Sequence, residues 1–121
     1  MRLALPLFED DVSPRFCGAD RILVVDIEEG RETGRHVVDP VPADFFDRLV
    51  LLRDLGVREL LCGGFNRCWL PLAESLGLRV FWGLWGPAEA VLQRRMEGLD
   101  PTARGRFGGG RRQRARRGRR P

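Results

Sequence analysis

The sequence has no lysine and no tyrosine, and its 121 residues include one histidine and three cysteines. Without lysine, a phosphate-binding loop of the Gly-x-x-x-x-Gly-Lys type is excluded. Three cysteines are too few, and odd in number, for a secreted disulfide framework, so free thiols or metal ligands are expected. No serine stands in a Ser-His-Asp context, and we expect no covalent catalyst.

Long apolar runs are also missing, because acids begin at Glu9 and no stretch before it is long enough for a signal peptide or a membrane span. We therefore expect a cytoplasmic protein that makes no membrane contact.

Charge is distributed unevenly along the chain. Residues 1–100 hold 12 arginines against 17 acidic residues, a net charge of −5, whereas residues 101–121 hold nine arginines and no acid. We expect one small domain over residues 1–100, because a chain of that length can bury one core. Residues 101–121 are expected to form a disordered Arg/Gly-rich tail, since they cannot build a core and repel one another.

The hydrophobic pattern predicts an α/β domain with a mixed sheet of five strands, in the order β-β-β-α-β-α-β-α. Strands are expected at 3–8, 21–27, 31–38, 57–62 and 78–81, helices at 42–55, 67–76 and 87–96, and a turn at 9–12. Asn66 is a candidate cap for the second helix, but Pro71 favours a regular helix that begins only near Leu70.

A hairpin followed by βαβ units implies parallel strands in the C-terminal half and helices on the faces of the sheet. Ligands usually bind outside the carboxyl ends of such strands, so the loops at 62–66 and 82–86 form the candidate site.

Short motifs follow one another along the first 99 residues at 1–6, 12–16, 23–30, 55–57, 62–64, 76–80 and 86–91. Their order and spacing resemble the dinitrogenase iron-molybdenum cofactor biosynthesis family, to which NifX-like proteins belong. The resemblance implies a ribonuclease-H-like α/β fold. It also implies a non-catalytic role in binding or carrying an iron-sulfur-type cluster, the iron-molybdenum cofactor or its precursor, with a cluster donor or acceptor protein as partner.

Cysteines are the candidate metal ligands of this chain. Many members of the family carry histidine where this chain has Arg15, and some carry a His-Gly segment where it has residues 39–42. We hypothesise that Cys17 and Cys62 contribute thiolates, the natural ligands of iron in clusters. Alternatively, Cys62 is a small buried apolar residue at a strand end and Cys17 a half-exposed thiol.

The full set of cofactor-binding candidates is Arg15, Cys17, Gly63, Gly64, Asn66, Trp82 and Trp85. The Arg15 guanidinium and the backbone N–H groups of residues 63–66 would offset the negative charge of a cluster. The two tryptophans flank the last loop, where they either line a cavity or cover the end of the sheet.

A two-metal nuclease is not expected, because the first strand has no acid. Asp26 ends its strand and Glu59 begins another, which places them toward opposite ends of their elements.

The tail suggests a second class of function. Residues 104–112 resemble the Arg-Gly boxes of disordered RNA-binding segments, with Phe107 available for stacking. Such a tail predicts weak, salt-dependent contact with nucleic acid, or contact with an acidic protein surface. The alternative to a cluster carrier is thus a nucleic-acid-associated or protein-interaction module on a fold that no longer binds cofactor.

Overall fold

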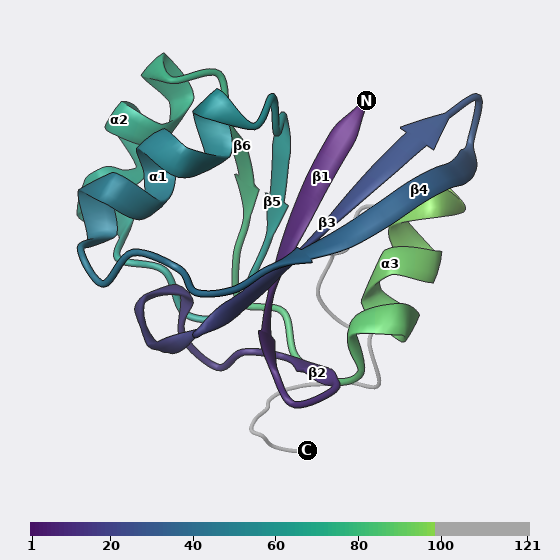
Figure 1. The fold of residues 1–121 in the computed structure, drawn as a ribbon, viewed down its shortest axis with the longest axis horizontal. Coiled ribbons are helices and arrows are strands. Elements are labelled where there is room, and N and C mark those ends of the chain that lie inside the picture. Colours follow the sequence, from purple (N-terminus) through teal and green to yellow (C-terminus); the bar gives the residue numbers. More distant parts are fainter. Residues whose placement is uncertain (99–121) are drawn as a thin grey trace.

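The computed structural model describes residues 1–98. Along the chain (Figure 1) the elements are β1 (Arg2–Phe8), β2 (Asp11–Val12), the 3-10 turn η1 (Phe16–Gly18), β3 (Arg21–Glu28), β4 (Arg31–Val38), α1 (Phe45–Asp54), β5 (Glu59–Leu61), the 3-10 turn η2 (Arg67–Trp69), α2 (Leu70–Ser75), β6 (Arg79–Phe81) and α3 (Ala88–Met96).

One mixed sheet with strand order β4-β3-β1-β5-β6 occupies the middle of the molecule, and β2 pairs with β1 beside this path. Strands β1, β5 and β6 are parallel, whereas β3 is antiparallel to both β1 and β4. The predicted mixed α/β sheet is confirmed, but the predicted number of five strands is wrong, because the sheet has six.

The additional strand is β2, which lies inside the segment predicted as a turn. The pairing of Asp11 with Phe8 and of Val12 with Leu7 confines the turn to Glu9 and Asp10. Strand β2 has two residues and follows a two-residue loop, so it is too short to stand out in the hydrophobic pattern.

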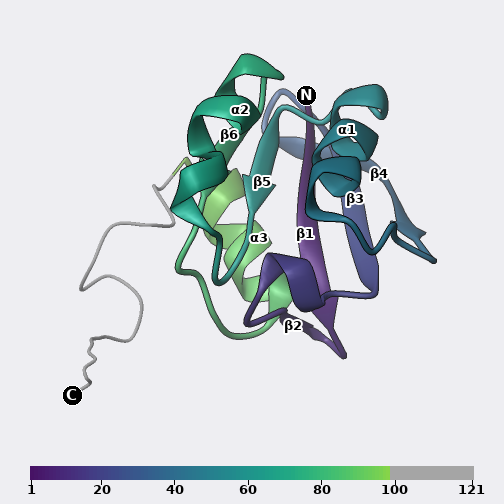
Figure 2. The same cartoon turned by 90° about the vertical axis from the view of Figure 1, so that its left-hand side faces the viewer.

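The sheet separates the core into two layers. Strand β1 contributes to both, because successive side chains of a strand point to opposite faces of the sheet. Leu3 and Leu5 belong to the layer under α3, whereas Ala4 belongs to the layer under α1 and α2. In Figure 1 α1 and α2 lie on one side of the sheet and α3 on the other, and in Figure 2 α1 and α2 face the viewer while α3 lies behind the sheet. No helix within residues 1–98 has the length and apolar character needed to cross a membrane.

Side-chain caps set where α1 and η2 begin. Helix α1 begins at Phe45 rather than at Pro42, because Asp44 accepts a hydrogen bond from the Asp47 N–H and so occupies the cap position. Asn66 caps η2 by accepting from the Cys68 N–H at 3.0 Å. The regular helix α2 begins at Leu70, as the position of Pro71 predicts.

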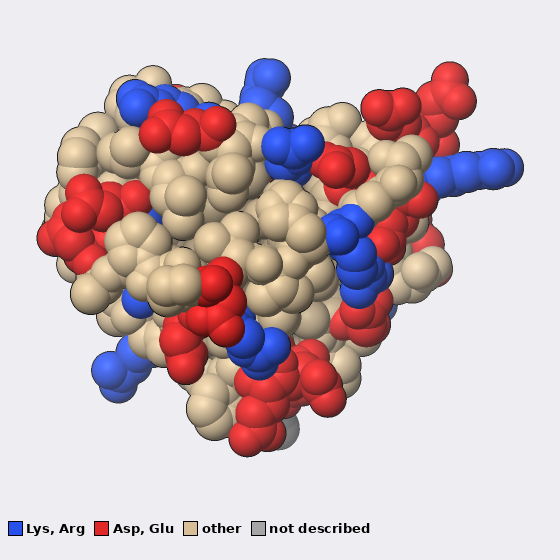
Figure 3. Space-filling view, viewed as in Figure 1, with Lys and Arg blue, Asp and Glu red and all other residues tan. Residues whose placement is uncertain are grey.

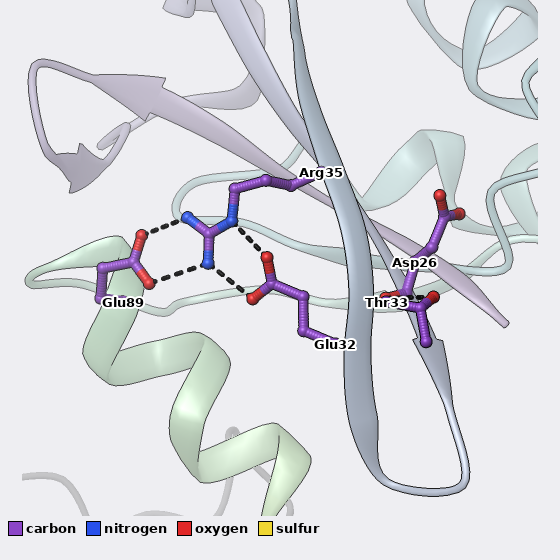
Figure 4. Close-up of polar contacts among 5 residues, drawn as sticks. All are labelled: Asp26, Glu32, Thr33, Arg35 and Glu89. Carbon is purple, nitrogen blue, oxygen red and sulfur yellow. Dashed lines mark hydrogen bonds and ion pairs between the residues drawn. The ribbon is translucent and has the colours of Figure 1, made fainter.

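One arginine fastens α3 to the edge strand β4 (Figure 4). The Arg35 guanidinium donates to the two carboxylate oxygens of Glu32 at 2.5 and 2.7 Å, and to those of Glu89 on α3 at 2.6 and 3.1 Å. Hydrogen bonds from Arg35 lower the pKa of both carboxyl groups below the ordinary value. The sheet edge and the helix are therefore joined by charge as well as by the core.

Candidate functional site

The loops that follow the parallel strands are joined to one another by backbone hydrogen bonds. Gly64 N–H donates to the Pro14 carbonyl at 2.6 Å, and Phe16 N–H donates to the Gly64 carbonyl at 2.9 Å. On the other side, Gly83 N–H donates to the Gly63 carbonyl at 2.8 Å. The structure thus brings the two predicted loops together and adds residues 13–16, and we call this region the loop junction.

Two glycines make this close approach possible. A Cβ atom at Gly63 would lie 2.4 Å from the Ser13 carbonyl oxygen, and one at Gly64 would lie 2.9 Å from the Pro14 carbonyl oxygen. Any larger residue would therefore push the loops apart. Because the Gly64 N–H already donates to Pro14, it is not available to an anion, which corrects the expectation that this group offsets cluster charge.

The three thiols have different surroundings. The Cys62 side chain is fully buried in the layer under α1 and α2, and burial raises the pKa of its thiol well above the ordinary value. Cys17 in η1 and Cys68 in η2 are exposed. In this conformation Cys62 presents no thiolate at the surface, so Cys17 is the accessible member of the predicted pair.

A closed metal site does not fit the donor set that the structure describes. Within residues 1–98, no group of three or more His, Cys, Asp or Glu side chains is placed to hold a metal ion. Iron-sulfur clusters resident in proteins are usually held by four cysteines. A permanently ligated cluster is therefore not supported by these residues alone.

The remaining predicted residues lie in or beside the loop junction. Arg15 is exposed, and its backbone forms an isolated bridge with Gly64. Asn66 is engaged as the cap of η2. Trp82 is half-buried and Trp85 is 62% exposed.

Arg67 is a basic residue of this region that sequence reasoning missed. Its guanidinium lies over the Trp82 ring, 5.4 Å from the centroid, in a cation–π contact. Its position directly after the predicted cap was a signal that could have identified it.

A cluster of aromatic rings, also missed, joins the segments around the loop junction. Phe45 stacks on Trp69 at 5.0 Å and meets Phe16 and Phe65 edge-on at 5.1 and 5.2 Å. These rings come from α1, η2, η1 and the glycine loop, so no local spacing could have predicted their contact. The cluster anchors the loops to the helix layer.

Arg48 of α1 places a buried positive charge beside η1. Its side chain donates to the Pro42 carbonyl at 2.6 Å and to the Phe16 carbonyl at 2.7 Å. No carboxylate forms an ion pair with Arg48 among residues 1–98. The backbone carbonyls compensate the cost of burial but leave the net charge in place.

The carboxylates considered for a nuclease lie at the opposite edge of the sheet. Asp26 pairs in register with Arg2, and Glu59 with Leu3, so both acids flank the same end of β1. Because Arg2 and Leu3 are successive residues of β1, the two carboxylates point to opposite faces of the sheet and do not form one cluster. Asp26 accepts from Arg2, and Glu59 accepts from Arg95 at 2.6 and 2.8 Å, so an arginine engages each carboxylate.

No protein-family model matches the chain, and comparison with curated protein sequences finds no match. Solved structures do resemble it. The crystal structure of PH0822 is 27% identical, with a TM-score of 0.76 over 82% of this chain and 91% of that one. A protein from Methanocaldococcus jannaschii, provisionally assigned as a dinitrogenase, is 14% identical, with a TM-score of 0.64 over 81% and 89%.

The apo form of the orange protein from Desulfovibrio gigas is 24% identical, with a TM-score of 0.67 over 84% of this chain and 92% of that one. These likenesses establish that the chain shares the fold of these solved structures, in agreement with the α/β fold that the resemblance of its motifs implies.

Proposed function

We propose that the folded part of the chain is a non-catalytic carrier of an anionic iron-sulfur-type cluster, with the iron-molybdenum cofactor or its precursor as cargo. The observation that carries this proposal is the loop junction, where the loops after the parallel strands are clamped together beside the exposed Arg15 and Cys17. One protein of similar fold, the orange protein, was solved in its apo form, which is consistent with cargo that can leave the protein. We also propose that the sheet belongs to the ribonuclease-H-like class of folds.

Charge and a small number of thiolates would hold such cargo. Arg15 and Arg67 are exposed, and the buried Arg48 adds positive charge from the side of α1. Cys17 supplies the accessible thiol, whereas Cys62 could become a ligand only if the loop junction opened. Incomplete ligation suits a carrier, because a donor or acceptor protein must complete and then replace the ligands.

The proposal is tested with full-length protein handled anaerobically. It is incubated with ferrous iron and sulfide, with and without molybdate, then desalted and measured for metal content and visible absorption. We expect coloured protein that retains iron, and a loss of about fivefold or more in Cys17→Ser, a change of roughly 1 kcal/mol in binding.

Cys68→Ser is the matched control, because Cys68 is also an exposed thiol in a 3-10 turn. Wild-type protein that stays colourless and metal-free under both conditions contradicts the carrier function. Equal retention by the two variants removes Cys17 from the site.

A second candidate function rests on the composition of residues 101–121, which lie outside the described residues. Nine arginines without an acid favour contact with phosphate backbones. In this alternative, the chain is a nucleic-acid-associated or protein-interaction module, and the domain no longer carries cofactor.

A further inference from the structure

A cavity of about 390 Å³ lies where β5 and β6 begin, at the edge of the sheet opposite the loop junction. Its lining residues are Met1, Arg58, Glu59, Gly77 and Arg79. We call it the arginine pocket. A smaller cavity of about 210 Å³ shares Arg79 with it and also touches Arg95.

The parallel strands bring these residues together from distant parts of the chain. Leu3, Glu59 and Arg79 stand side by side in register across β1, β5 and β6. Arg58 N–H donates to the Arg2 carbonyl, and Arg79 N–H donates to the Arg58 carbonyl, each at 2.8 Å. Two guanidiniums therefore start from neighbouring backbone positions on a rigid sheet edge.

The pocket is positively charged although the domain around it is acidic. Among residues 1–98, no carboxylate forms an ion pair with Arg58 or Arg79. Glu59 is the acid in the lining, and Arg95 neutralises it.

The surroundings make this charge local. In Figure 3 acidic side chains gather over the β3–β4 turn and near β2, and basic side chains stand where β1 and β5 begin as well as between the acidic ones over β4. The acidic groups would repel an anion, so its attraction to the arginine pocket depends on the arginines of the pocket itself.

Packing orders one of the two guanidiniums before any ligand arrives. The Arg79 guanidinium lies over the Phe81 ring at 4.8 Å, and Arg95 contacts the same ring at 5.3 Å. Two like charges beside one ring are stabilised when an anion binds between or beside them. A guanidinium held by stacking also loses less entropy when it binds a phosphate.

We propose that the arginine pocket binds a small phosphate ester, through charge-assisted hydrogen bonds from Arg58 and Arg79 to its phosphate oxygens. Its volume falls within the range of about 300–1,000 Å³ common for small-molecule sites. The planar fork of arginine matches the geometry of phosphate oxygens. This site is independent of the loop junction and goes beyond the carrier function.

The test is calorimetric titration of the full-length chain at low salt with AMP, ATP and inorganic phosphate as probes. In the double variant Arg58→Gln/Arg79→Gln we expect the affinity for the nucleotides to fall about tenfold or more. The matched control is Arg31→Gln/Arg53→Gln, which removes two exposed guanidiniums outside the pocket and retains residues 101–121. The control should bind as the wild type does.

Equal affinity in the two double variants, or no binding of any probe to the wild type, overturns the proposal. The wild type alone provides a second measurement if the pocket variant folds poorly. In NMR titration with AMP, the backbone amide signals of Gly77 and Arg79 should shift before that of Arg31, and the reverse order also overturns the proposal.

Discussion

At the scale of single residues, the loop junction depends on two glycines, which carry no side chain. Gly63 and Gly64 let two backbones approach more closely than any Cβ atom would allow. Their chief role is therefore to position the loops, rather than to present N–H groups to an anion. This role explains a glycine pair in a loop without invoking a phosphate-binding function.

Gly63→Ala tests this role. The added Cβ would meet the Ser13 carbonyl oxygen at 2.4 Å, so the loops must move. We expect the free energy of unfolding to fall by about 1–3 kcal/mol, the usual range for overpacking, as measured by urea denaturation.

Gly18→Ala is the control within the same region, because its added Cβ would meet Arg15 Cβ at an ordinary 3.8 Å. A change in Gly63→Ala no larger than that in Gly18→Ala would show that the close approach does not constrain the loops.

At the scale of elements, caps and charge decide how helices join the sheet. Asp44 and Asn66 set the starts of α1 and η2, and Arg35 links α3 to β4. The Glu89 side chain is 68% exposed, so solvent screens its pairing with Arg35. The link orients α3 more than it stabilises the whole molecule.

The contribution of Arg35 should depend on pH. Glu32 and Glu89 have folded-state pKa values below the ordinary 4.5, so their ion pairs stabilise the fold fully above that pH. This stability is lost as the pH falls through the lowered values. We expect Arg35→Ala to cost no more than about 1 kcal/mol per pair at pH 7, and progressively less on acidification.

Thermal or urea unfolding across this pH range measures the effect, with Arg31→Ala on the same strand as the control. Arg31 is exposed and forms no ion pair within residues 1–98. A pH-independent difference between wild type and Arg35→Ala would contradict the proposed ion-pair contribution.

At the scale of the whole molecule, the sheet separates two candidate binding regions. The carboxyl edge of the parallel strands holds the loop junction, and the amino edge holds the arginine pocket. The overall charge of +4 conceals an acidic domain and a strongly basic C-terminal segment. The proposed contact with nucleic acid therefore belongs to a different part of the chain from the proposed cargo site.

Removal of residues 101–121 tests this division. We expect the full-length chain to bind single-stranded RNA at low salt, with affinity that falls steeply as salt rises, because nine arginines can displace phosphate counterions. The chain that ends at residue 100 should lose this affinity. Fluorescence titration at several salt concentrations makes the measurement, and an unchanged affinity after truncation would remove the segment from RNA binding.

Local pattern was sufficient for much of the fold. The alternation in β1, the apolar run of β3 and the turn near Gly30 are encoded within a few residues, because periodicity and turn preference are short-range properties. Pro71 likewise predicted where α2 begins. The ordered motifs predicted a fold group that comparison of structures confirmed.

The sequence by itself determined the helices, every strand except β2, where most of these elements end, and how charge is divided along the chain. Only the tertiary structure decided that Cys62 is buried, that Asp26 and Glu59 flank the same end of β1, and that Arg58 and Arg79 line one cavity. The physical reason is strand direction: neighbours across a sheet depend on which strands pair and how they run, which involves residues far apart in the sequence.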